Sequence, residues 1–198
     1  FLDSDDLWVK GKLQAQVKWI ENQPNCHAVY TDEIWIRNGV RVNPMNKHHK
    51  YSGDIFQNCL PLCIVSPSSV LLKAEMLNEV GGFDESMPVC EDYDLWLRIA
   101  RCFPFHFIEE KLIVKRGGHA DQLSRKFWGM DLWRVYALEK LLKENGLNEA
   151  QRDGVVAMLI EKCRILITGY GKRGKTQDEK YYRDLVTRYS NLVEEPEK

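Results

Sequence analysis

The chain has 198 residues, with 29 acidic side chains against 28 Lys and Arg, so its formal net charge is −1. This length suits one ordinary domain with or without a small appendage, and 44% hydrophobic residues is typical of a globular protein. The neutral balance disfavours a general nucleic-acid binder, which carries a basic excess. The longest apolar run, Val155–Ile160, is far shorter than the roughly 20 residues of a membrane-spanning helix, so no transmembrane segment is expected.

The start of the chain and its cysteines bear on two questions, whether the chain is part of a longer protein and in which compartment it occurs. Residue 1 is Phe and the first Met is at position 45, which indicates a cropped or processed chain or a fragment of a longer reading frame. The acidic start FLDSDD does not look like a secretory signal. The six cysteines are scattered, and the one close pair, Cys59 and Cys63, is a weak metal signal. We therefore expect reduced thiols in a cytoplasmic protein, with a peripheral position at the inner face of the membrane as a further expectation.

The first predicted elements are a strand end and a helix. Phe1-Leu2 is expected to close a buried strand. A helix follows and stops at Pro24, because apolar residues repeat at positions i, i+4 and i+7. The repeating residues are Leu13, Val17 and Ile20.

A β-hairpin is predicted around Asn38-Gly39, because both residues tolerate positive φ and the flanking runs are β-rich. The polar stretch that follows is expected to be loop with one short helix. The predicted segments are a strand at 28–31, hairpin strands at 34–36 and 40–42, and a loop at 44–58 with its helix near 54–56.

The next stretch continues the mixed α/β pattern. A helix at 73–80 is expected to end at Gly81-Gly82, since glycine adopts the left-handed C-terminal position. Gly117-Gly118 opens a polar loop. Strands are predicted at 64–66 with 69–72, at 105–108 and at 112–115, and a second helix at 91–101.

Beyond residue 125 the pattern is helical throughout. Asn148 and Gln151 form a capping-box pair that begins one of these helices. The apolar residues at helical spacing are Trp128, Leu132, Val135, Leu138 and Leu142 in the first helix and Tyr182, Leu185 and Tyr189 in the last.

The first candidate for chemistry is Asp3-Ser4-Asp5-Asp6. Carboxylates this close repel one another, and in a turn after a strand they can share a hard divalent cation with phosphate oxygens of a substrate. Ligands of α/β sheets lie beyond the carboxyl ends of the strands. The alternative is an acidic helix start, in which Asp and Ser act as caps.

Two further segments carry polar groups of the right types. Glu91-Asp92-Tyr93-Asp94 opens a helix, and a carboxylate there suits a general base, with simple capping as the alternative. The loop after Gly117-Gly118 contains His119, Ser124 and Arg125, which can contact a metal or a diphosphate, with a solvated loop as the alternative.

Together these segments resemble family 2 glycosyltransferases. FLDSDDLWVKGKL resembles their DxD segment, GGFDE followed by EDYDLWLRIA resembles their acceptor-side segment, and GGHADQLSR resembles their His-containing loop. Order and spacing fit, with about 85 positions from the first to the second and about 27 to the third. The resemblance implies the C-terminal part of a GT-A, Rossmann-like α/β domain over residues 1–125, followed by a helical region over 126–198.

The resemblance also implies a reaction, the inverting transfer of a sugar from a nucleotide diphosphate sugar to a glycan, lipid-linked or protein acceptor. Asp92 would be the general base with Glu91 beside it, because an acceptor hydroxyl needs a base. A divalent cation, Mn²⁺ or Mg²⁺, would stabilise the leaving diphosphate. Its implied ligands are Asp5, Asp3 and His119, and the implied donor-binding set is Asp3, Asp5, Asp6, Gly82, His119, Ser124 and Arg125, with Gly81–Asp84 lining the sugar or acceptor side.

One departure from the family pattern bears on activity. The strand, turn and helix that hold the nucleotide base and ribose in family members do not occur in these residues, so we expect this chain alone to bind the donor weakly or not at all. The alternative function is a non-catalytic GT-A-like remnant or interaction module.

Gly169–Thr176 matches the P-loop string GxxxxGK[ST]. A P-loop precedes most of its sheet, whereas only 22 residues follow Thr176. A helix, a basic turn and a last helix are therefore expected here.

Overall fold

Strands β2 and β5 form the centre of the sheet in the computed structural model, which describes residues 1–23, 25–118, 127 and 129–194. Within these residues the sheet has the order β1-β5-β2-β3, and β4 pairs with β2. β2 and β5 are parallel, whereas the other pairs are antiparallel. The strands are β1 Leu7–Trp8, β2 Ala28–Arg37, β3 Val40–Val42, β4 Val70–Leu72 and β5 Phe105–Gly117.

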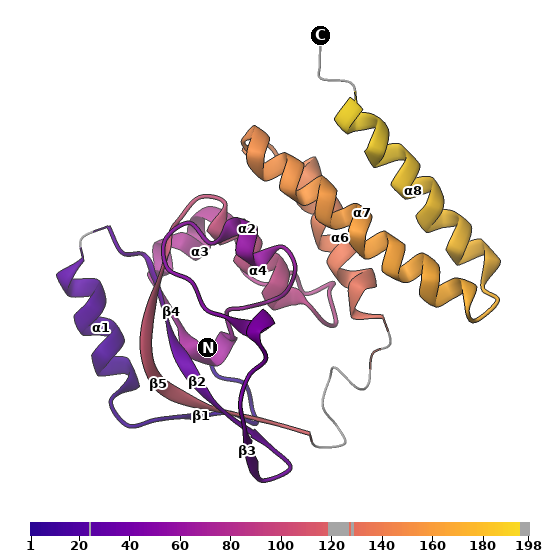
Figure 1. The fold of residues 1–198 in the computed structure, drawn as a ribbon. Coiled ribbons are helices and arrows are strands. Elements are labelled where there is room, and N and C mark those ends of the chain that lie inside the picture. The colour runs from indigo at the N-terminus through magenta and orange to yellow at the C-terminus, as the bar shows by residue number, and fades with distance from the viewer. Residues whose placement is uncertain (24, 119–126, 128, 195–198) are drawn as a thin grey trace.

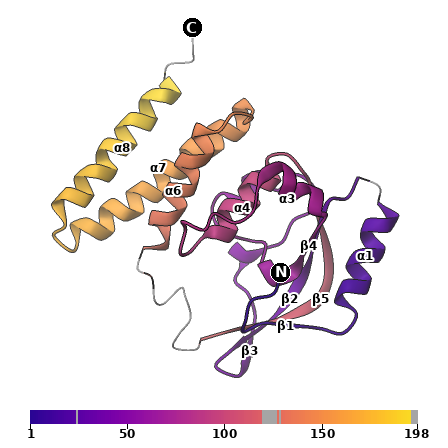
Figure 2. The same ribbon diagram turned by 180° about the vertical axis from the view of Figure 1, so that it is seen from behind.

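Helices cover both faces of this sheet (Figure 1). α1 lies on one face, and α2, α3 and α4 lie on the other, as the reverse view confirms (Figure 2). α6, α7 and α8 extend outward beyond α4 as the helical region. The helices are α1 Lys12–Asn22, α2 Phe56–Cys59, α3 Ala74–Val80, α4 Glu91–Ala100, α6 Met130–Lys143, α7 Glu149–Gly171 and α8 Thr176–Glu194, with short 3-10 helices η1 Asn46–His48 and η2 Pro67–Ser69.

β2 and β5 are each continuous where the sequence pattern predicts shorter pieces. The register between them shifts at Asp32, which pairs with Lys111, while the next residue Glu33 pairs with Ile113. An irregularity of this kind takes up extra residues without ending a strand, so the charged stretch 109–111 stays inside β5.

The predicted hairpin is confirmed. Asn38 and Gly39 have φ of 50° and 78°, and the flanking Arg37 and Val40 are paired. The predicted strand at 64–66 is wrong, because Pro67 begins a 3-10 helix and β4 starts only at Val70.

Phe1-Leu2 is not part of a strand in this structure, and the two residues are 43% and 51% exposed. The Phe1 ring instead packs edge-on against Phe83 and Trp96, with ring centroids 5.1 and 6.1 Å away. This contact brings the start of the chain to α4 and to the loop before it.

The α1 helix forms where predicted, but its buried face differs from the expected one. Leu13 and Val17 are 44% and 43% exposed, whereas Lys12 and Gln16 are buried. The reason is a hydrogen-bond requirement of the sheet. The Gln16 amide donates to the carbonyl of Val29 at 3.1 Å and to a carbonyl next to β4 at 2.8 Å, and no apolar side chain can do this.

The helical region follows the predicted pattern from Met130 onward, and Trp128 lies outside the described residues. The capping box between Asn148 and Gln151 is present in both directions at the start of α7. α7 continues through Gly169 to Gly171, and a turn leads to α8 at Thr176. The P-loop string thus begins in the last turn of a helix and not after a strand. In the described part of the chain no helix is both long and apolar enough to cross a membrane.

Candidate functional site

The acidic segment at the start of the chain is held against η2. The backbone N–H of Asp3 donates to Ser68 Oγ at 3.0 Å, and the Trp8 indole donates to the Ser68 carbonyl at 3.0 Å. Because β1 also pairs with β5 at Val114 and Ile113, the segment is fixed at both ends.

Asp3 and Asp92 come from two different motifs, and the fold places them within electrostatic reach. Burial raises the pKa of Asp3, and the carboxylates of Asp6, Asp92 and Asp5 raise it further, while Lys115 acts in the opposite direction. The acidic start and the ED pair therefore lie within electrostatic reach of each other, an arrangement that a shared site would require.

Asp6 lies beneath this site and not on its surface. It is 5% exposed, and its Oδ1 accepts a 3.0 Å hydrogen bond from the backbone N–H of Arg116 on β5. Burial raises its pKa, against the effects of the Ser68 hydroxyl and the Arg116 N–H. Its contacts give Asp6 a part in holding the turn next to Asp3 and Asp5.

The start of α4 presents Asp92 with its carboxylate fixed on both oxygens. Oδ1 accepts from the Tyr93 N–H at 2.7 Å, and Oδ2 lies 3.1 Å from the thiol of Cys63. Cys90 precedes the helix with φ of 62°, a left-handed conformation that non-glycine residues rarely adopt and that occurs more often at functional sites. Burial raises the pKa of Glu91, and Asp92 and Asp3 raise it further.

Lys115 of β5 is a cation at this acidic site. Its Nζ donates to Ser66 Oγ at 2.7 Å. Burial alone would lower the pKa of Lys115. The neighbouring acidic groups outweigh burial and raise this pKa; in decreasing order of effect they are Glu33, Cys63, Asp6 and Asp92.

A buried ion pair lies next to Lys115. Glu33 is 3% exposed and bonds to the ammonium of Lys50, which also donates to the Ile64 carbonyl at 2.9 Å. Burial alone would raise the pKa of Glu33, but Lys50 and Lys115 lower it overall, so it stays ionised. The wall of the site thus carries fixed charges of both signs.

The loop between α3 and α4 contains Gly82. Arg98 of α4 holds this loop by donating to the carbonyls of Val80 and, at 2.7 Å, Gly82, and its guanidinium pairs with Asp94 at 2.8 Å. Phe83 packs against Phe1, so the loop lies beside the acidic segment. The structure therefore brings Gly82 close to the first motif.

The carboxylate of Asp84, expected on the sugar or acceptor side, bonds to two side chains of the protein. Its Oδ2 accepts from Lys140 of α6 at 2.7 Å, and its Oδ1 accepts from Ser86 at 2.6 Å. The Lys140 and Ser86 hydrogen bonds lower its pKa to about 2. Both carboxylate oxygens are thus engaged within the protein.

The third motif is only partly visible. His119, Ser124 and Arg125 lie outside the described residues. Sequence reasoning missed Cys63, Ser68 and Lys115. Lys115 had a signal in its place two residues before the GG loop, and Cys63 had a weak one in its spacing from Cys59. Ser68 reaches the site through tertiary contacts alone.

The donor atoms at the site fit a divalent cation only together with a substrate. Among the described residues, no three or more His, Cys, Asp or Glu side chains are arranged to hold a metal ion. However, Asp3 lies close enough to Asp6 and Asp92 for their charges to raise its pKa, and a cation would relieve this repulsion. Mg²⁺ typically takes one or two carboxylates with phosphate oxygens and waters, which suits this geometry.

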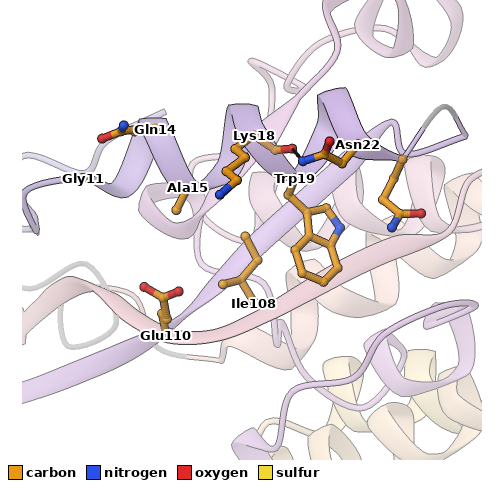
Figure 3. A pocket seen from close by; sticks show the side chains of 9 residues that line it. Gly11, Gln14, Ala15, Lys18, Trp19, Asn22, Ile108 and Glu110 are labelled. Atoms are coloured by element: carbon orange, nitrogen blue, oxygen red, sulfur yellow. Dashed lines mark hydrogen bonds between the residues drawn. The ribbon is translucent and has the colours of Figure 1, made fainter.

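A separate groove of about 560 Å³ lies between α1 and β5, on the other face of the sheet. Trp19 projects from α1 toward Ile108 of β5, and Glu110 lies further along the strand (Figure 3). Gly11, near the end of the first motif segment, lines this groove, but none of the described candidate site residues does, so the groove is not part of the candidate site.

Comparisons with known proteins agree with the motif pattern. The model of a family described as "Glycosyltransferase like family 2" matches residues 1–133. An uncharacterised glycosyltransferase of Rickettsia conorii is 30% identical over 138 residues, which are 64% of this chain and 22% of that protein. One of Methanocaldococcus jannaschii is 26% identical over 140 residues, 70% of this chain and 48% of that protein. The chain therefore spans between about a fifth and a half of these relatives.

A solved structure supports the fold. S. aureus TarS, determined in complex with UDP-GlcNAc, superposes with a TM-score of 0.57 at 16% identity. The match covers 82% of this chain and 46% of TarS. The mixed sheet with helices on both faces is therefore a GT-A glycosyltransferase architecture, as expected from the sequence, and the helical region follows it.

Proposed function

The chain belongs to the family 2-like glycosyltransferases, and on that basis we propose that it takes part in the inverting transfer of a sugar from a nucleotide diphosphate sugar to an acceptor hydroxyl. The observation that carries the proposal is that Asp3 and Asp92, two motif residues far apart in the sequence, lie near enough for the charge of Asp92 to raise the pKa of Asp3. It supports a site in which the segment proposed to bind the metal and the phosphates lies near the carboxylate proposed as the base.

Asp92 is the proposed general base. An acceptor hydroxyl has a pKa far above 7, so its attack on the sugar needs a base within hydrogen-bond reach. The hydrogen bonds from Cys63 and from the Tyr93 N–H fix the orientation of the carboxylate. A single displacement with one base inverts the configuration at the sugar carbon. Glu91 is the proposed supporting neighbour.

The donor side of the proposed site is formed by the acidic segment. Asp3 and Asp5, with His119, would hold Mn²⁺ or Mg²⁺, and Asp6 supports their turn. When bound, the cation supplies positive charge that stabilises the leaving diphosphate. Lys115 adds a fixed positive charge beside Asp6 and Asp92.

The remaining donor contacts are assigned by motif. Gly82, Ser124 and Arg125 complete the proposed donor-binding set, and TarS binding UDP-GlcNAc makes a UDP-sugar the first donor to test. The acceptor class, whether glycan, lipid-linked or protein, stays open.

Substitution of Asp92 by Asn tests the base. In the full-length protein we expect sugar transfer or donor hydrolysis, measured as UDP release from UDP-GlcNAc with Mn²⁺, to fall by about 10²–10⁴-fold. Donor affinity measured by calorimetry should change little, because the base does not hold the diphosphate. Asp153→Asn on the exposed side of α7 is the matched control and should keep the wild-type rate. A wild-type rate in Asp92→Asn would favour the non-catalytic remnant or interaction module instead.

The metal assignment has its own test. Asp3→Asn and Asp5→Asn should each weaken Mn²⁺-dependent binding of UDP-GlcNAc at least about tenfold, since each removes a charged ligand. Binding that is equally tight in wild type and both variants, with or without Mn²⁺, would contradict the cation site.

A further inference from the structure

The thiol of Cys63 lies against the carboxylate of Asp92. Its Sγ is 3.1 Å from Asp92 Oδ2 and 3.2 Å from the Val65 carbonyl. The other carboxylate oxygen accepts from the Tyr93 N–H. Asp92 is therefore held from two directions, by its own helix and by the segment that links α2 to η2.

That linking segment is anchored on both sides of Cys63. The Tyr93 hydroxyl donates to the Leu60 carbonyl at 2.6 Å, and Lys50 donates to the Ile64 carbonyl at 2.9 Å. Since Tyr93 follows Asp92 directly on α4, one bond ties the thiol segment to the helix that carries the carboxylate. The position of the thiol is thus a property of the packed fold.

The Cys63 thiol is protonated and can therefore donate a hydrogen bond. Burial raises the Cys63 pKa well above its ordinary value, and the charge of Asp92 raises it further, so the sulfur keeps its proton. A thiol is a weak donor to neutral acceptors, but a bond to an ionised carboxylate is charge-assisted.

We propose that Cys63 is a positioning residue that fixes the Asp92 carboxylate in one orientation through a thiol hydrogen bond. The inference rests on the proposed function in so far as Asp92 is the base. Without the thiol, Asp92 keeps only the bond to its helix and can rotate away from an acceptor hydroxyl. A small misplacement of a catalytic group costs a large factor in rate.

Kinetics of two variants test the role. Cys63→Ala should lower kcat about tenfold and leave the KM for UDP-GlcNAc unchanged, whereas Cys63→Ser, which keeps a donor, should recover most of the rate. Asp3, Glu91 and Lys115 also face Asp92 and are unchanged in both variants.

The contact between Cys63 and Asp92 can also be tested without measuring sugar transfer. Iodoacetamide attacks the thiolate, so its rate at Cys63, followed by mass spectrometry, reports how firmly the proton is held. Asp92→Asn removes the neighbouring negative charge and should accelerate alkylation of Cys63 several-fold at pH 8, relative to the exposed Cys102 in the same chain. An unchanged ratio would overturn the proposed contact.

The two proposals fail in different ways. If Asp92→Asn abolishes transfer while Cys63→Ala keeps the wild-type rate, the positioning role is wrong and the base assignment stands. If Asp92→Asn retains full transfer, the base assignment fails, and the role of Cys63 in catalysis fails with it, whatever the alkylation ratio shows about the contact.

Discussion

Lys140 of α6 donates a 2.7 Å hydrogen bond to Asp84, in the loop that precedes α4. The same ammonium lies 3.1 Å from Asp94 on α4, which is 2% exposed and also pairs with Arg98. One side chain of the helical region therefore joins the loop of the GGFDE segment to the helix of the ED pair. The helical region thus helps to hold the candidate site together.

Removal of this link should destabilise the fold. We expect Lys140→Met to lower the free energy of unfolding by about 1–3 kcal/mol, because the buried Asp94 carboxylate loses one of its two cationic partners. Urea denaturation measures the change. Lys180→Met is the matched control, since the Lys180–Asp184 pair on α8 is solvent-exposed and should contribute less than about 0.5 kcal/mol. Equal effects of the two substitutions would contradict a structural role of the Lys140 link.

Asp84 should make stability depend on acid pH. Its pKa is about 2 in the folded chain, against an ordinary value of 3.8, because the hydrogen bonds from Lys140 and Ser86 favour its ionised form. A lowered pKa contributes stability above the ordinary value, and this contribution is lost as the pH falls from about 4 to about 2. The free energy of unfolding should therefore decrease across this window, and Lys140→Met should flatten the decrease. A parallel pH dependence in both proteins would contradict the assignment.

The pH dependence of stability that Asp3 contributes should have the opposite sign to that of Asp84. Burial and the neighbouring carboxylates raise its pKa, so its ionised form destabilises the fold at neutral pH. A raised pKa contributes stability that is complete below the ordinary value and is lost as the pH rises through the folded pKa. Asp3→Asn should then stabilise the chain by about 0.5 kcal/mol at pH 8, a small gain because solvent screens a half-buried carboxylate. The gain should vanish at pH 3, and a loss of stability at pH 8 would contradict the prediction.

Lys175 should be irrelevant to nucleotide binding, although it occupies the lysine position of the P-loop string. It lies in the turn between α7 and α8, where the preceding element is a helix. Lys175→Ala should leave the affinity for UDP-GlcNAc with Mn²⁺ unchanged in calorimetry. A complete loss of binding in this variant would assign the nucleotide to the turn and not to the acidic segment.

The local elements were predictable from the sequence because short-range interactions decide them. The hairpin at Asn38-Gly39 needs positive φ, and the capping box of Asn148 with Gln151 joins residues three apart. The motif order likewise indicated that the acidic start and the ED pair serve one site. The family match over residues 1–133 confirms the family assignment.

The tertiary structure decided which side chains those elements bury and what surrounds each carboxylate. α1 turns Gln16 inward, and not Leu13, because carbonyls of β2 and of the residue before β4 need a donor. Cys63 reaches Asp92 across 29 positions, and Lys140 reaches Asp84 across 56. Such contacts depend on how whole elements pack, and neither spacing nor propensity along the chain encodes them. The sequence by itself therefore determined the elements and the motif carboxylates, whereas only the packed fold decided which partners hold those carboxylates in place.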